Sequence, residues 1–157
     1  MAAQSMIAEA RISLRGSYAY SPSIRVSNGN QDLYDGTGAV ARLGWIHGLD
    51  ETFIYYQWTR QTANYTDINP FQSTDQMMGL GYRNYLSPGR MVFLEGSAQY
   101  AISNGFSNSF GIGLGGGINF SLADRVSLGI TTLFTFFFPS GIQRRFITQS
   151  IDLGFIF

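Results

Sequence analysis

The sequence ends in Ile151-Asp152-Leu153-Gly154-Phe155-Ile156-Phe157, the most informative segment of the chain. Bulky apolar residues stand at positions 151, 153, 155 and 157, with Asp152 and Gly154 between them. Such alternation is typical of a β-strand that has one apolar and one polar face. Because chain ends usually fray into water, a strand that runs to a terminal phenylalanine predicts a last residue held in place.

The composition predicts a single domain, residues 1–157, that differs from an ordinary soluble one. Charged residues make up 13% of the chain, about half the share of a soluble domain, while 19 glycines and 15% aromatic residues are present. No run approaches the roughly 18 apolar residues of a transmembrane helix. Zero net charge argues against nucleic-acid binding, and the lack of cysteine excludes disulfides and thiol chemistry. The N-terminal residues lack the basic start and apolar core of a signal peptide, so we expect a mature or recombinant form.

Eight segments of the chain show the same period-two alternation. We predict strands at residues 8–20, 36–46, 51–62, 75–86, 91–102, 110–122, 126–138 and 143–157. Each is long enough for the roughly 9–11 residues that a tilted strand needs to cross a bilayer. Long connections alternate with tight turns, as in outer-membrane barrels, so both chain ends and the tight turns are expected on the periplasmic side. The connections at 21–35, 63–74, 103–109 and 139–141 are then extracellular loops.

The two faces of these strands distinguish a membrane barrel from a soluble one such as a lipocalin, which must place its charges outside. One face is nearly uncharged. The other carries most strand glycines and nine charged residues: Glu9, Arg11, Arg15, Arg42, Glu51, Arg83, Glu95, Arg144 and Asp152. Glycines on a water-facing surface would only weaken the sheet, whereas inside an eight-stranded barrel they make room for long side chains. We therefore predict an all-β, closed, eight-stranded antiparallel up-and-down transmembrane β-barrel with a polar, charged interior.

In strand count, alternation, loop asymmetry and the ending at Phe157, the whole chain resembles the small OmpA/OmpX-type outer-membrane barrels. The resemblance implies a location in the bacterial outer membrane, among lipopolysaccharide, and insertion by the barrel assembly machinery. It also implies that the machinery reads the last strand as an assembly signal. The residues that would carry this signal are Ile151, Leu153, Gly154, Phe155 and Phe157.

The nine charges of the inner face are the first candidate site. Buried charges must be paired, because each unpaired ion costs several kcal/mol of desolvation. They form either an ion-pair plug or a gated path for small ions, and we favour the plug because a barrel of this size leaves no standing water channel.

Three arginines near the outer rim, Arg25, Arg60 and Arg145, are a second candidate. Guanidinium groups there are suited to pair with lipopolysaccharide phosphates. Ordinary snorkelling of the side chains toward water explains them equally well.

An enzyme is the least favoured reading. The only histidine, His47, lies in a predicted periplasmic turn, whereas barrels that modify lipid A place their catalytic groups near the extracellular side. A Ser–His mechanism needs hydrogen-bond reach, and no serine is in register with His47. We expect no catalytic, cofactor or metal site. The predicted role is a membrane scaffold or an accessory subunit bound to a protein partner in an envelope complex. The alternative is a narrow ion pore or an OmpW-like transporter of small apolar molecules.

Overall fold

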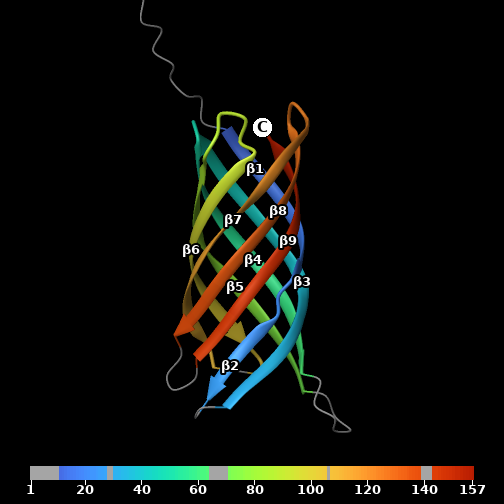
Figure 1. Cartoon of the computed structure of the whole chain (residues 1–157), viewed down its shortest axis with the longest axis vertical. Helices are drawn as coiled ribbons and strands as arrows, with labels where there is room; N and C mark the ends of the chain where they lie inside the picture. The colour runs from blue at the N-terminus through green and yellow to red at the C-terminus, as the bar shows by residue number, and fades with distance from the viewer. Residues whose placement is uncertain (1–10, 28–29, 64–70, 106, 139–142) are drawn as a thin grey trace, which may run out of the picture.

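The computed structural model describes residues 11–27, 30–63, 71–105, 107–138 and 143–157, and its strands form one closed antiparallel sheet (Figure 1). The strands are β1 (Arg11–Tyr20), β2 (Ser23–Ser27), β3 (Asn30–His47), β4 (Asp50–Ala63), β5 (Phe71–Tyr85), β6 (Val92–Ser103), β7 (Ser109–Ala123), β8 (Val126–Phe138) and β9 (Gln143–Ile156). Both β1 and β2 lie between β3 and β9, so they are two parts of one wall strand. The described chain is therefore an eight-stranded barrel, as predicted.

The first and last strands close the barrel. Strand β1 pairs with β9 over eight residue positions, from Ser13 opposite Ile156 to Tyr20 opposite Gln149. Beyond this ladder, the Phe157 N–H donates to the Ile12 carbonyl (2.8 Å) and the Ile12 N–H donates to the Phe157 carbonyl (3.2 Å). Closure removes the open sheet edges that a bilayer could not solvate.

The predicted loop at residues 21–35 is wrong, because most of it forms β2 and the start of β3. Pro22 interrupts the wall strand without ending it: its carbonyl still accepts a hydrogen bond from the Ile147 N–H (3.0 Å). Beyond Pro22, pairing with both β3 and β9 satisfies the backbone of β2. Strand β5 likewise begins at Phe71, four residues before the predicted start at 75. Elsewhere the strand ends differ from the prediction by one residue or none, apart from the start of the first strand, which lies outside the described residues.

Apolar side chains cover the outside of the barrel. Leu80 and Leu114 on the outer register expose 61% and 65% of their surface, whereas Arg83 on the inner register exposes 1%. A soluble protein has the reverse arrangement, so this surface faces lipid. No helix in the described ranges is long and apolar enough to cross a membrane.

The connections β3–β4, β5–β6 and β7–β8 are tight turns at the same end of the barrel as the C-terminus (Figure 1). Short turns mark the periplasmic end of outer-membrane barrels. At this end the Tyr82 hydroxyl and the Asn84 amide donate to the Asp50 carboxylate beside the β3–β4 turn (2.5 and 2.7 Å). At the opposite end the Tyr20 hydroxyl donates to Asp35 (2.8 Å), so lipid-facing tyrosines mark both interfaces.

Candidate functional site

Six charged side chains from six strands meet inside the barrel. They are Arg15 on β1, Arg42 on β3, Glu51 on β4, Arg83 on β5, Glu95 on β6 and Asp152 on β9, and we call them the charged belt. All are at most 5% exposed. Strand alternation directs each of them inward, since each occupies the inner register of its own strand. With three cations and three anions, the belt is electrically neutral.

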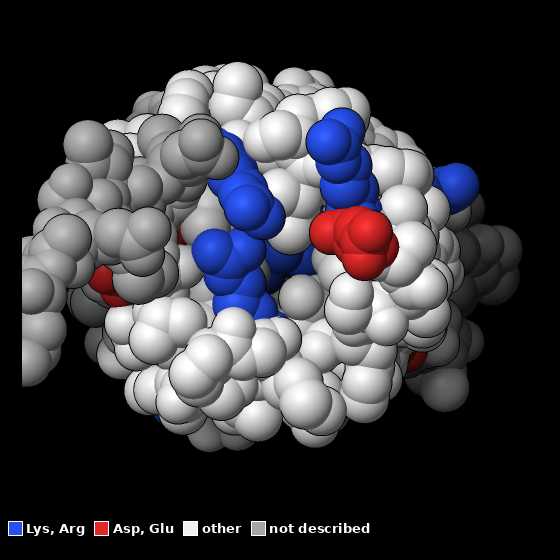
Figure 2. All heavy atoms as spheres, turned by 90° about the horizontal axis from the view of Figure 1, so that it is seen from above, with Lys and Arg blue, Asp and Glu red and all other residues white. Residues whose placement is uncertain are grey.

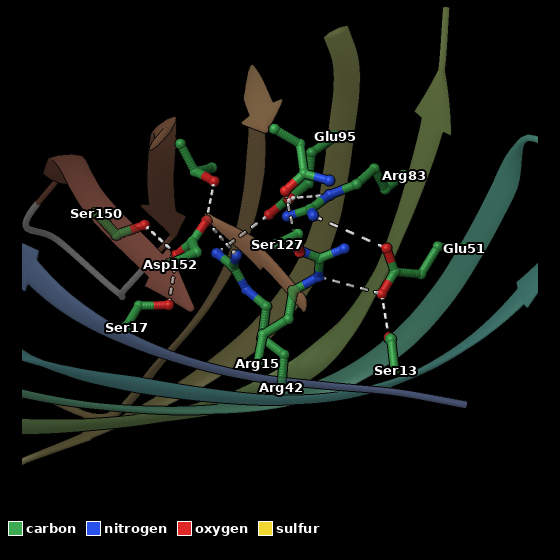
Figure 3. A network of polar contacts seen from close by, with 12 residues as sticks. Ser13, Arg15, Ser17, Arg42, Glu51, Arg83, Glu95, Ser127, Ser150 and Asp152 are labelled. Carbon is green, nitrogen blue, oxygen red and sulfur yellow. Dashed lines mark hydrogen bonds and ion pairs between the residues drawn. The ribbon is translucent and has the colours of Figure 1, made fainter. Parts of the chain in front are cut away.

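The belt is a chain of alternating charges (Figure 3). Arg83 makes its shortest contact with Glu95, with Nη2 at 2.6 Å and Nε at 3.1 Å from Oε2. On its other side, Arg83 Nη1 lies 3.8 Å from Glu51 Oε2, and Glu51 Oε1 lies 3.6 Å from Arg15 Nε. Arg42 continues the chain, 3.5 Å from both Glu95 and Asp152. Because Arg42 and Glu95 stand three strands apart around the wall, their contact crosses the lumen.

Hydroxyl groups solvate two of the three belt carboxylates, Glu51 and Asp152. Glu51 accepts hydrogen bonds from Ser13 and from Tyr85, the latter at 2.6 Å. Asp152 accepts them from three hydroxyls, those of Ser17, Thr131 and Ser150. A buried carboxylate is stabilised when its remaining lone pairs are satisfied, and these donors provide that for Glu51 and Asp152.

Arg144 belongs to a separate pair and not to the belt. Its Nη1 and Nη2 atoms lie 3.3 and 2.8 Å from the two carboxylate oxygens of Asp75, which is fully buried. Asp75 is not among the predicted network residues, because the sequence places it at the first position of a strand, beside a polar loop. The signal was present nonetheless, since Asp75 shares its register with Arg83.

Of the two remaining residues of the predicted network, only Arg11 lies in the part of the chain that the structure describes. Arg11 is exposed at the periplasmic mouth. It is the first described residue of β1, and the inner face of this strand becomes buried only from Ser13 onward. Glu9 lies outside the described residues.

Aromatic rings fill much of the lumen, which the sequence reading did not expect. The ring of Phe53 lies where a β-carbon at Gly81 would be, and a β-carbon at Gly117 would come within 2.6 Å of Phe93. The Arg83 guanidinium also lies 3.8 Å from the centroid of the Phe93 ring, a cation–π contact. Interior glycines therefore make room for rings as well as for charges, as Gly44 does beside Glu51.

Two buried apolar clusters lie in the lumen besides the belt. One contains Ala19, Val40, Phe53 and Tyr55, and the other Met77, Ala101, Phe137 and Phe146. The second lies toward the extracellular end, since Met77 precedes Arg83 by six residues on β5.

The three outer-rim arginines differ in direction. Arg60 is exposed on the lipid-facing register and donates to Gln72 (2.6 Å). Arg145 is exposed on the same face and donates to Gln143 (3.4 Å). Arg25 stands opposite Arg144 on the inner register of β2 and is half-buried.

The residues of the expected assembly signal lie on both faces of β9. Ile151, Leu153, Phe155 and Phe157 are exposed on the lipid-facing register. Gly154 faces inward, where a β-carbon would come within 2.9 Å of Arg15 Nη1. His47, predicted in a turn, is the last residue of β3, where it pairs with Asp50, and its side chain is exposed.

No protein-family model matches the sequence, and a search of curated proteins finds no match. Solved structures do match in fold. Neisserial surface protein A is 11% identical, with a TM-score of 0.62 over 90% of this chain and 95% of that one. Ail, the attachment invasion locus protein of Yersinia pestis, is 14% identical, with a TM-score of 0.61 over 95% of this chain and 99% of Ail. Ail in complex with the heparin analogue sucrose octasulfate matches with a TM-score of 0.60 at 12% identity, over 95% of this chain and 99% of that one. The chain thus has the fold of the small eight-stranded outer-membrane barrels of the OmpA/OmpX type, and its apolar outer face is the lipid-facing surface of such a barrel.

Proposed function

We propose that this chain is a non-enzymatic, non-conducting barrel that serves as a scaffold of the outer membrane or as an accessory subunit of an envelope complex. The observation that supports the proposal is the filled lumen. From the periplasmic end outward, the interior holds the charged belt, the cluster around Phe53, and the cluster around Phe137 beside the Arg144–Asp75 pair. A path for ions would have to pass each of these in turn.

Single-channel recording in planar bilayers tests the non-conducting part of the proposal. A filled lumen predicts no discrete conductance steps, measured with the folded protein and with protein-free detergent as the blank. Steps that scale with the amount of folded protein would overturn the proposal in favour of a narrow pore. Uptake of small apolar molecules into vesicles would similarly favour a lateral transporter.

The mass of the native particle distinguishes a free scaffold from an accessory subunit. The chain alone has a mass of 17.4 kDa. Extracted from its own membranes in mild detergent, a free-standing scaffold should give this mass plus bound detergent. A larger particle of fixed stoichiometry would identify an accessory subunit, and its companion chains would identify the complex.

For the lipid partner, we propose that Arg60 and Arg145 pair with lipopolysaccharide phosphates in the outer leaflet. Both side chains are exposed on the lipid-facing register near the extracellular end, where a guanidinium is suited to bidentate phosphate contacts. The double variant Arg60→Gln/Arg145→Gln should bind lipopolysaccharide several-fold more weakly than the wild type in a pull-down of the folded barrel. Arg125→Gln is the matched control, because this exposed arginine lies in a periplasmic turn. Equal binding by all three proteins would leave snorkelling as the explanation.

A further inference from the structure

The barrel has a cavity of about 720 Å³ at its periplasmic end, which we call the vestibule. Residues of the three tight turns contribute to its wall, among them Gly48, Arg90 and Asp124, and Arg11 of β1 lines it too. Viewed onto this end of the barrel, the surface is hollowed, and basic side chains border the hollow beside one acidic group (Figure 2).

The floor of the vestibule is polar. Asn119 on β7 and Ser127 on β8 line it, and they are 7% and 4% exposed. The side-chain oxygen of each lies 3.4 Å from Arg15 Nη1, at the long limit of a hydrogen bond. The vestibule therefore ends at the charged belt, and both floor residues keep hydrogen-bonding capacity toward the cavity.

The charge of the vestibule is positive. Because the belt is neutral, the charged lining residues set the local potential, and these are Arg11, Arg90 and Asp124 among the described residues. Arg90 uses one donor, Nη2, on the Gly48 carbonyl (2.8 Å). Arg11 is exposed and lines the cavity. Concave sites with low-dielectric walls focus such a potential and concentrate ions of the opposite sign.

We propose that the vestibule binds a small organic anion through a carboxylate or phosphate group. Arg11 and Arg90 hold the anionic group, since guanidinium donors match both carboxylate and phosphate oxygens. Asn119 and Ser127 hydrogen-bond to the polar part of the ligand on the floor. This binding site is independent of the proposed scaffold role, because it needs neither conductance nor a protein partner.

Nuclear magnetic resonance of the folded barrel in neutral maltoside micelles tests the proposal. Citrate and glycerol 3-phosphate are titrated separately at constant ionic strength, with glycerol as the uncharged control. We expect saturable shifts of the backbone amides of Gly48, Gly89 and Ser127, with resonances near the extracellular end unchanged. Saturation by citrate alone assigns the site to carboxylates, and saturation by glycerol 3-phosphate alone assigns it to phosphates. Saturation by both assigns it to the anionic group that they share.

Three variants locate the binding. Arg11→Gln and Arg90→Gln should each weaken binding about tenfold, the loss expected for one charge-assisted hydrogen bond. Asp35→Asn, which changes the net charge by one unit at the opposite end of the barrel, should bind as the wild type does. Because Arg90 also contacts the β3–β4 turn, Arg11→Gln is the decisive variant, and the heat-dependent gel shift of each variant verifies that it is folded. Absence of saturable shifts with both anions, or equal affinity of Arg11→Gln and the wild type, would overturn the proposal.

Discussion

At the scale of single residues, the inner and outer glycines of this barrel have opposite roles. Gly81 faces the lumen, and a β-carbon there would overlap the Phe53 ring, which is itself 1% exposed. Gly16 faces lipid, and a β-carbon there would meet no heavy atom within 4 Å. The pair separates the effect of interior packing from the general effect of replacing a strand glycine.

Gly81→Ala should destabilise the barrel by about 1–3 kcal/mol, because the added methyl group overpacks the lumen. Gly16→Ala should be neutral or stabilise by up to about 1 kcal/mol, since alanine loses less chain entropy on folding. Reversible urea unfolding in lipid vesicles, followed by tryptophan fluorescence, measures both. Equal shifts of the unfolding midpoint for the two substitutions would contradict the inference that the Phe53 ring needs the space beside Gly81.

Glu95→Ala should destabilise by about 3–5 kcal/mol, because it leaves two buried arginines, Arg42 and Arg83, without a shared anion. The same unfolding measurement applies. Asp124→Ala is the control, since this carboxylate is exposed in a turn. An unchanged midpoint for Glu95→Ala would mean that the belt does not depend on Glu95.

The sequence predicts which side chains enter the lumen but not which of them meet. Period-two alternation places Arg83 and Arg144 on the inner face, and both are buried there. Their partners depend on height along the barrel and on the shear between strands, which alternation does not contain. Asp75 was therefore overlooked as the partner of Arg144. The interior rings were overlooked for a related reason: an aromatic residue favours a strand on either face.

At the scale of elements, the wall strand made of β1 and β2 shows where sequence reading fails. Proline and a cluster of polar residues normally indicate a loop, and Pro22 was read in that way. In a closed barrel, however, two neighbouring strands can hold an interrupted strand in register on both sides. Ser23 to Val26 pair with both β3 and β9, which overrides the local signal. Strand ends are set by such neighbours, so local sequence alone does not locate them.

Two changes at the end of the last strand distinguish the role of the Phe157 side chain from the role of the Phe157 backbone. Phe157→Ala keeps both backbone hydrogen bonds to Ile12, whereas deletion of Phe157 removes them. In vitro, only the deletion should lower the unfolding midpoint, because the Phe157 side chain is 67% exposed. In cells, both variants should reduce the amount of folded protein in the outer membrane, because both lose the terminal aromatic of the proposed assembly signal. Normal assembly of Phe157→Ala in cells would remove the side chain from that signal.

At the scale of the whole molecule, the fold could be predicted because both faces of the strands are the opposite of those in a soluble barrel. The outer face is apolar and the inner face is polar. The chain places apolar residues on the outer register of the wall strands and gathers its buried charges on the inner register, and only a closed barrel in lipid satisfies both. Function is less accessible for the same reason. Most of the sequence follows the alternation that specifies the barrel, so few residues are left to indicate a function. The candidate sites consist mainly of arginines, and only the folded structure shows which residues they contact.

The lipid-facing tryptophans give the whole-molecule test. Trp45 lies two residues before the end of β3 at the periplasmic turn. Trp58 on β4 pairs with Ala39, which lies six residues before Trp45 on β3 and so closer to the extracellular end. At about 3.3 Å per residue and a tilt of about 40°, the two rings lie roughly 15 Å apart along the membrane normal, within an apolar band about 25 Å tall. In the variant Trp58→Phe, Trp45 should be quenched best by lipids brominated near the head group. In Trp45→Phe, Trp58 should be quenched best by lipids brominated deeper in the acyl chain.

Both tryptophans report from the same outer surface, so absence of quenching by any brominated lipid would contradict the membrane-embedded barrel itself. Equal depth for both would instead contradict the tilt and register from which their separation follows.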